Sequence, residues 1–197
     1  MRLFIAFPIS QEVKNELESA FVSLRQTTAD RLKWTSEDGW HITVAFLGDI
    51  DVVETQCIAS LREVIETVCK KYRPMNFRLD KIDGFPNIEN PNVIVAKAID
   101  ESGMASQLQK ELVDKLRKIG IEIENRLWKP HITIARNKMG ERVTGLDKVK
   151  IEPIRWKVNE VILFESELWP SGPARHASQL AGVAGRPRYT KIYSCNL

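Results

Sequence analysis

Cysteine is scarce in this sequence, and the three residues present are not arranged to cross-link a small scaffold. Cys57, Cys69 and Cys195 are odd in number, widely spaced and lack a Cys-x-x-Cys pair. Small disulfide-stabilised domains need paired cysteines, so this pattern argues against that class. It predicts a protein of the reducing cytoplasm.

Long apolar runs are also lacking, and neither sign of charge dominates. No stretch of the 197 residues approaches the length of a membrane span, and the apolar stretch at 3–7 is too short for a signal peptide. Lys and Arg number 29 against 26 Asp and Glu. That balance permits a local basic patch without requiring nucleic acid as a partner. We therefore expect a soluble, cytosolic protein with no membrane contact.

The chain does contain enough apolar residues for one substantial core, since they make up 43% of it. Spacings of about four residues predict three amphipathic helices, and short runs rich in β-branched and aromatic residues predict strands. Ser10 is expected to cap the first helix. The expected helices cover 13–24, 53–68 and 104–119, and the expected strands cover 3–7, 41–48, 77–82, 92–96, 128–136, 158–164 and 190–193.

These predicted elements run in a similar order in the two halves of the chain. Asp83-Gly84 predicts a turn that begins a loop to Pro91, and 170–187 forms a second predicted loop. Neither loop has the character of an interdomain linker. Residues 1–197 are therefore predicted to form a single α+β domain, in which two similar lobes face each other across a cleft.

Two of the three histidines begin the same triplet, His41-Ile42-Thr43 and His131-Ile132-Thr133. A given histidine is followed by Ile-Thr by chance only about once in a few hundred cases. On a strand, residues i and i+2 share a face, so each histidine lies beside the threonine of its triplet. Two such strands at matching positions of a repeat would direct two imidazoles and two hydroxyls into one space.

This set of side chains suits displacement at phosphorus. Imidazole titrates near neutral pH, so one ring can take a proton from water while the other protonates the leaving oxygen. Threonine hydroxyls can donate hydrogen bonds to the non-bridging phosphate oxygens. A 2′,3′-cyclic phosphate is already strained and carries one charge, so this chemistry needs no metal.

Two other interpretations of the pair stay open. A single His-x-Thr is usually an ordinary packed strand, which is a weaker explanation for two copies. Zinc is the other alternative, because histidine is its commonest ligand and catalytic zinc needs three protein ligands. The remaining histidine, His176, lies in the predicted loop 170–187, and no carboxylate shares the histidine face of either strand.

The two motifs and their surroundings resemble the RNA 2′,3′-cyclic phosphodiesterase family, also called 2′-5′ RNA ligase, of the two-histidine (2H) phosphoesterase superfamily. The similarity extends to about residue 170. It includes Arg2 to Ala6, Trp34, Phe46-Leu47-Gly48, Lys129-Pro130, Ala135-Arg136 and Leu163 to Leu168.

The resemblance implies a bilobal α+β fold with antiparallel sheets lining a central cleft. It implies hydrolysis of an RNA-terminal 2′,3′-cyclic phosphate to a 2′-phosphomonoester, with reversible 2′-5′ joining in some members. His41 is then the proton donor, His131 the acceptor, and Thr43 and Thr133 the phosphate ligands, although the nearly symmetric motifs do not themselves distinguish donor from acceptor. The expected partner is RNA or an oligonucleotide, with no cofactor, no metal and a monomeric chain.

Phe46 and Arg136 follow the two histidines at the same offset of five residues. By resemblance, Arg136 binds the phosphate or its neighbours, and Phe46 could stack on a base. Simple alternation places both on the face opposite the histidines, unless a bulge or a strand end redirects them. On the sequence alone we favour Arg136 as substrate-binding and Phe46 as structural.

The chain departs from the family pattern between Gly172 and Arg188, an insertion with three arginines. We favour a solvated loop over an RNA contact for it. Trp34, Trp40 and Trp128 flank the motifs and either pack or stack on bases. The functional alternatives are a small cyclic nucleotide, ADP-ribose 1″,2″-cyclic phosphate or a 2′-5′ linkage as substrate, and an RNA-end-binding protein with little catalysis.

Overall fold

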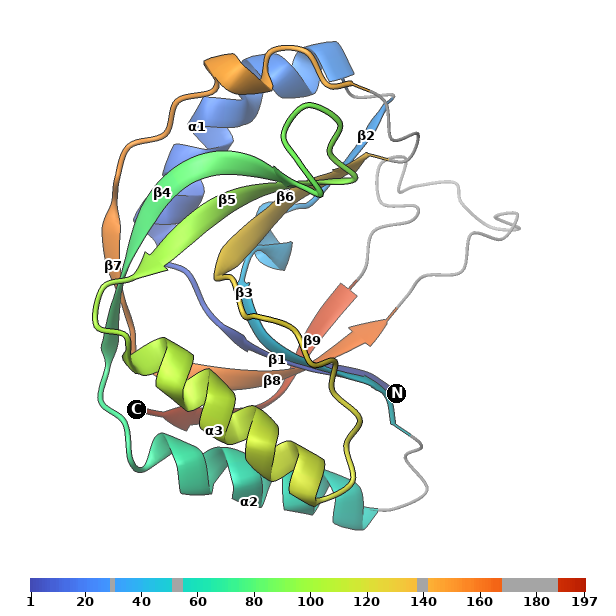
Figure 1. Ribbon diagram of the computed structural model, residues 1–197, viewed down its shortest axis with the longest axis vertical. Helices are drawn as coiled ribbons and strands as arrows, with labels where there is room; N and C mark the ends of the chain where they lie inside the picture. The colour runs from blue at the N-terminus through green and yellow to red at the C-terminus, as the bar shows by residue number, and fades with distance from the viewer. Residues whose placement is uncertain (29–30, 51–54, 138–141, 168–187) are drawn as a thin grey trace, which may run out of the picture.

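The computed structural model of the chain describes residues 1–28, 31–50, 55–137, 142–167 and 188–197. Its secondary structure is α+β, as the sequence predicts (Figure 1). The helices are α1 (Gln11–Thr28), α2 (Thr55–Cys69) and α3 (Met104–Lys118), with short 3-10 turns at Glu37–Gly39 and Leu146–Lys148. The strands are β1 (Arg2–Phe7), β2 (Leu32–Trp34), β3 (Ile42–Asp49), β4 (Met75–Phe85), β5 (Val93–Asp100), β6 (His131–Asn137), β7 (Arg155–Val158), β8 (Glu160–Glu167) and β9 (Arg188–Asn196).

The strands form one antiparallel sheet in the order β7-β4-β5-β6-β3-β1-β8-β9, with β2 paired to β6. Its two halves are joined at β3 and β6 through a single residue pair, Ile42 opposite Ile132. We call β1, β3, β8 and β9 the first lobe and β2, β4, β5, β6 and β7 the second lobe. Figure 1 shows α2 and α3 beside the first lobe and α1 beside the second. Two lobes of antiparallel sheet with flanking helices confirm the predicted architecture.

The apolar faces predicted from helical spacing are the faces that the helices bury. In α1 they are Val13, Leu17, Phe21 and Leu24, and the Ser10 hydroxyl caps the helix by accepting a hydrogen bond from the Val13 amide at 3.4 Å. In α3, Leu108, Leu112 and Leu116 are buried in the same way. Because burial of each such side chain contributes about 1.5–3 kcal/mol, these stripes fix the helices on the sheet.

The lobes do not correspond to the two halves of the chain. The C-terminal strands β8 and β9 complete the first lobe by pairing with β1, while β2 from the N-terminal half pairs with β6 of the second lobe. Each lobe therefore draws on both ends of the sequence. Each lobe is completed by strand pairs between residues far apart in the sequence.

The predicted Asp83-Gly84 turn is wrong, because both residues lie inside β4. The chain reverses later, where the Asn92 amide donates to the Phe85 carbonyl at 2.7 Å. Glycine serves packing at this position: a Cβ on Gly84 would lie 2.6 Å from the Asn87 carbonyl oxygen as the loop folds back. The strands β2 and β7 were not assigned from the sequence because each is short.

Cys57 and Cys69 lie in α2 and Cys195 in β9, all with free thiols. Within the described part of the chain, no helix has the length and apolar character to cross a membrane.

Candidate active site

The two His-Ile-Thr triplets meet where the lobes join. Ile42 and Ile132 are fully buried and directly opposite each other in antiparallel strands. Continuing that register by one residue in each direction places His41 across from Thr133 and Thr43 across from His131. All four of these side chains are half-buried, on the face of the sheet opposite the buried isoleucines. The predicted convergence of the motifs is thus what the strand register produces.

Each motif strand contains a β-bulge at the same point. In β3, Ala6 pairs with Thr43 and Ile5 with Ala45, which leaves Val44 as the extra residue. In β6, Val95 pairs with Thr133 and Ile94 with Ala135, which leaves Ile134. An extra residue reverses the phase of the side-chain alternation beyond it.

The bulges turn Phe46 and Arg136 onto the histidine face. Both residues are exposed, Phe46 at 53% of its surface, whereas Ala45 and Ala135 before them are buried. The simple alternation that placed both residues on the opposite face is therefore wrong, and the bulge alternative is correct. Arg136 also lies near enough to His131 and Tyr189 to affect the pKa of each.

Hydrogen bonds to the backbone orient both imidazoles in the same way. His131 Nδ1 lies 2.7 Å from the carbonyl oxygen of Lys129, which assigns the proton to Nδ1 and leaves Nε2 free to accept. His41 has a backbone hydrogen bond with Gly39, also two residues earlier, while its Nε2 lies 3.1 Å from Thr43 Oγ1. Each ring is thus held by the residue at i−2 and presents Nε2 for chemistry.

Burial lowers the pKa of both histidines, against the opposing effect of these backbone hydrogen bonds. The pKa of His41 falls from 6.5 to about 4, with repulsion from His131 adding to the shift. The pKa of His131 is also lowered, first by burial and then by the positive charges of Arg126 and Arg136. The lowered pKa favours the neutral form of both rings at pH 7, and the effect of His131 on His41 agrees with the strand register that brings the motifs together.

Aromatic rings surround His41. Its ring centroid lies 4.8 Å from that of Phe4, 5.4 Å from that of Tyr189 and 6.2 Å from that of Phe164. These residues come from β1, β9 and β8, so only long-range pairing brings them together. Phe4 is buried yet lies outside the main core, on the strand position opposite Phe46. The sequence interpretation missed this cluster, because each residue alone has the pattern of an ordinary aromatic residue in a strand.

His131 has mostly charged neighbours, whereas the neighbours of His41 are aromatic. Phe85 makes one edge contact with His131, at 5.1 Å between centroids. Lys97 is the strand partner of His131 and forms an ion pair with Asp83, whose pKa is lowered by Lys97 despite the opposing effect of burial. The sequence interpretation gave none of these three residues a place at the site, and it named Asp83 only as part of a turn.

The tryptophans near the motifs serve packing. Trp40 is only 3% exposed, and the Arg25 guanidinium lies 5.2 Å from the Trp34 ring and 5.6 Å from the Trp40 ring. Trp128 donates a hydrogen bond from Nε1 to the Thr43 carbonyl at 2.9 Å, which ties the segment before β6 to β3. The packing interpretation therefore holds for Trp34 and Trp40.

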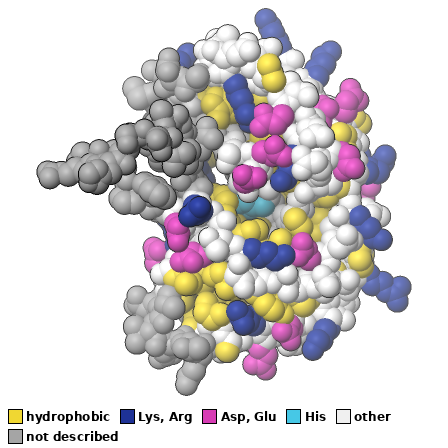
Figure 2. Space-filling model, turned by 180° about the vertical axis from the view of Figure 1, so that it is seen from behind, with side chains coloured by type: hydrophobic (Ala, Val, Ile, Leu, Met, Phe, Trp, Pro, Cys, Tyr) yellow, Lys and Arg dark blue, Asp and Glu magenta, His cyan; other side chains and the backbone are white. Residues whose placement is uncertain are grey.

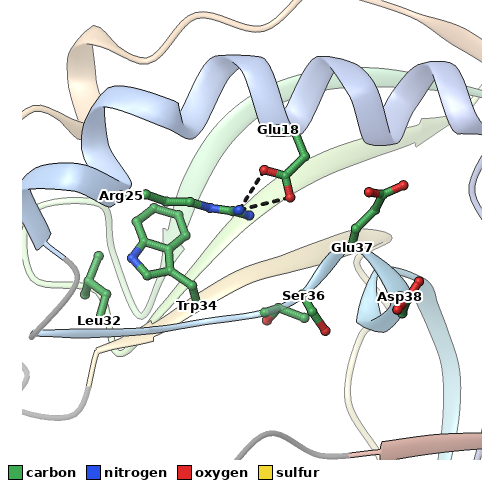
Figure 3. A pocket seen from close by; sticks show the side chains of 8 residues that line it. Glu18, Arg25, Leu32, Trp34, Ser36, Glu37 and Asp38 are labelled. Carbon is green, nitrogen blue, oxygen red and sulfur yellow. Dashed lines mark hydrogen bonds and ion pairs between the residues drawn. The ribbon is translucent and has the colours of Figure 1, made fainter. Parts of the chain in front are cut away.

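A separate cavity of about 550 Å³ lies between α1 and the β2 segment, where Arg25 also pairs with Glu18 at 2.6 Å (Figure 3). Neither motif histidine lines it. Figure 2 shows histidine atoms in a recess on one face of the molecule, with basic, acidic and apolar side chains around them. His176 and positions 172–187 of the predicted insertion lie outside the described residues.

The described residues contain no group of three His, Cys, Asp or Glu side chains placed to hold a metal ion. The third ligand weighed for zinc, His176, falls outside those residues, so its position is not compared with the motif histidines.

Solved structures with the same class of fold support this architecture. A structure from Thermus thermophilus aligns over 100% of this chain and 98% of its own, with a TM-score of 0.76 and 26% identity. Escherichia coli LigT, solved as a complex with 3′-AMP, aligns over 100% of this chain and 97% of its own, with a TM-score of 0.69 and 20% identity. At that identity the second likeness concerns the fold alone.

The family follows from the sequence comparison. The family model of the 2′-5′ RNA ligase superfamily matches residues 13–168, and the chain belongs to this superfamily. An RNA 2′,3′-cyclic phosphodiesterase of Methanocaldococcus jannaschii is 30% identical over 88% of this chain and 95% of its own length. A protein of the same name from Geobacillus stearothermophilus is 26% identical over 84% of this chain, which spans only 52% of that relative.

Proposed function

We propose that the protein hydrolyses 2′,3′-cyclic phosphates at RNA ends to 2′-phosphomonoesters, with His41 and His131 as general acid and base. The observation that carries the proposal is the register at Ile42 and Ile132, which brings two His-x-Thr motifs together on one face. The relatives named RNA 2′,3′-cyclic phosphodiesterase support the choice of substrate.

In the proposed reaction, His131 Nε2 removes a proton from a water whose oxygen attacks phosphorus. The bond between phosphorus and the 3′ oxygen breaks, and His41 donates its Nε2 proton to that oxygen. The phosphate stays on the 2′ oxygen, and one water is consumed. One proton leaves His41 and one arrives at His131, so the pair returns to its starting state by exchange with solvent.

The surroundings of the two rings support this assignment of roles. Arg126 and Arg136 lower the pKa of His131 and so favour the neutral base. His41 lies among aromatic rings, and burial there lowers its pKa, so its protonation depends on the charge of a bound substrate. A bound cyclic phosphate brings a negative charge between the rings, which raises the pKa of His41 from about 4 and allows it to be protonated when substrate is present.

Thr43 and Thr133 are proposed to donate hydrogen bonds to the non-bridging oxygens, where negative charge develops in the transition state. Arg136 is proposed to bind the phosphate as well, because the bulge in β6 directs it to the histidine face. Phe46 is now proposed to stack on the terminal base, since the bulge in β3 exposes it on that same face. Such a contact contributes about 1–3 kcal/mol.

We further propose that residues 1–197 act as a single domain and as a monomer in the cytoplasm. Both histidines come from one chain, so the proposed site needs no second copy. Reversible 2′-5′ joining of RNA ends would use the same groups in reverse order. The absence of a disulfide-type cysteine pattern supports the proposed compartment.

Turnover of a short RNA ending in a 2′,3′-cyclic phosphate tests the proposed reaction. The assay is run with and without EDTA, and the position of the product phosphate is then determined. A 2′-phosphate produced at the same rate in EDTA is the expected result. Loss of activity in EDTA would support the metal alternative. A 3′-phosphate product would show that the 2′ oxygen, and not the 3′ oxygen, is the leaving group. No turnover would contradict the proposal.

A further inference from the structure

Lys33 lies directly opposite Arg136 in the pairing of β2 with β6. Directly opposite residues of an antiparallel pair share a face, with Cβ atoms about 4.5–5.5 Å apart. Lys33 is exposed, and its neighbour Leu32 is buried in the core. Because Arg136 is on the histidine face, Lys33 is on that face too.

Lys33 and Arg136 have no ion-pair partner in the part of the chain that the structure describes. By contrast, Lys97 on the same face is paired with Asp83 and Arg25 on the far side of the sheet with Glu18. Like charges directly opposite each other destabilise a strand pair. The repulsion between Lys33 and Arg136 lowers the stability of the free protein. An anion bound between the two side chains would remove that repulsion.

The place of the pair in the sheet indicates which anion. Arg136 influences the pKa of His131. The strand β2 pairs with β6 on the same edge as β3, beyond the Ile42–Ile132 pair (Figure 1), so Lys33 extends the positive charge of Arg136 along this edge. In the other direction, the strand partner of Arg136 is the apolar Val93, followed by Phe85. At Arg136, positive charge therefore continues toward β2 and not toward β5.

We infer that Lys33, next to Arg136, forms a second anion subsite, which binds the phosphodiester on the 5′ side of the terminal nucleotide while Arg136 lies between the two phosphates. The inference rests on the proposed function, because the terminal cyclic phosphate must lie at the histidines. A cyclic mononucleotide has no second phosphate, so the subsite makes the enzyme prefer oligonucleotides. The equivalent pair in the first lobe is Phe4 opposite Phe46, which carries no charge. The backbone of the RNA thus runs over the second lobe.

The test compares Lys33→Gln with the wild type on two substrates, 2′,3′-cyclic AMP and a trinucleotide ending in a 2′,3′-cyclic phosphate. We expect kcat/KM on the trinucleotide to fall about tenfold, as for loss of one charge-assisted contact. The value on cyclic AMP should stay unchanged. On the trinucleotide, the slope of log kcat/KM against log salt should become shallower by about 0.7.

Two further variants control for charge and folding. Lys110→Gln removes an equal charge from an exposed position of α3 and should leave both substrates unaffected. Lys33→Arg keeps the charge and should retain most of the trinucleotide activity. Equal losses on both substrates, or no loss on the trinucleotide, would overturn the subsite.

A failure of the proposed function is recognised separately. If the wild type hydrolyses neither substrate, the binding of a 3′-phosphorylated trinucleotide and of 3′-AMP is measured by titration. Selective weakening of trinucleotide binding in Lys33→Gln would then support the subsite without the chemistry. Unchanged trinucleotide binding would reject it.

Discussion

The strands β3 and β6 carry the same order of buried and exposed positions from Ile42 to Leu47 and from Ile132 to Asn137, including a bulge at the same point. The side chains that this shared backbone presents are opposite in character. The first lobe surrounds its histidine with Phe4, Tyr189 and Phe164, and the second places Arg136 and Arg126 beside its own.

The comparison teaches how two nearly identical motifs can take different roles. The backbone places the two histidines in matching positions, and the neighbouring side chains differ in the groups that they offer to a substrate. Under the proposed function, the first lobe offers aromatic rings to a nucleobase, and the second offers positive charge to a phosphate. The predictions below test this division, beginning with the largest expected effect.

Removing either histidine should have the largest effect, because each lobe supplies one proton-transfer group. We expect His41→Ala and His131→Ala each to lower kcat about 10²–10⁴-fold, with little change in oligonucleotide affinity. Turnover and binding of a trinucleotide substrate measure the two effects. His176→Ala is the matched control and should turn over normally. Full activity in His41→Ala or in His131→Ala would show that the replaced histidine is not a general acid or base.

Replacing Arg136 and Phe46, the two residues that the bulges turn onto the histidine face, should affect the salt dependence of kcat/KM differently in the two lobes. Arg136→Gln is expected to lower kcat/KM on an oligonucleotide about 10–100-fold and to make it less salt-dependent, because a phosphate contact is lost. Phe46→Ala should lower it about 5–100-fold through lost stacking, with an unchanged salt slope. Steady-state kinetics at several salt concentrations measure both slopes. A changed slope in Phe46→Ala would contradict the division between lobes.

Acid should destabilise the protein more through the first lobe than through the second. The unfolded chain binds protons at histidine near pH 6.5, whereas the pKa of His41 in the folded protein is about 4. The stability contributed by neutral His41 is present above pH 6.5 and is lost as pH falls from 6.5 toward 4, by about 3 kcal/mol in all.

Urea unfolding at pH 7 and pH 4.5 measures this loss. His41→Ala should reduce the difference in stability between the two pH values, and His131→Ala should reduce it as well. An unchanged difference in His41→Ala would show that the ring is not buried in its neutral form.

Removing the hydrogen bond from Trp128 to the Thr43 carbonyl should have the smallest effect. Trp128→Phe removes the hydrogen bond to the Thr43 carbonyl and should cost about 1 kcal/mol of unfolding free energy. Trp156→Phe is the control, because the indole nitrogen of Trp156 is buried without a hydrogen-bond partner in the described structure. Urea denaturation compares the two variants. Equal losses of unfolding free energy in the two variants would show that the smaller ring, and not the lost hydrogen bond, causes the effect.

The helices and most strands could be predicted because their signals are local. The spacing of Val13, Leu17 and Phe21 alone identifies the buried face of α1. Asp83-Gly84 misled because a turn-forming pair also suits a position where a loop folds back onto the strand. The bulges at Val44 and Ile134 could not be placed, since nothing in either residue distinguishes an extra strand position from a paired one.

The sequence by itself determined the candidate reacting groups: two His-x-Thr motifs on strands, whose period of two places imidazole and hydroxyl side by side. Tertiary structure decided what lies around them. Phe4, Tyr189, Lys33 and Lys97 enter the site through strand pairing between distant segments, and Phe46 and Arg136 through a bulge in each motif strand. A face of a strand is a local property, whereas a neighbour across the sheet depends on register, which only the whole fold fixes.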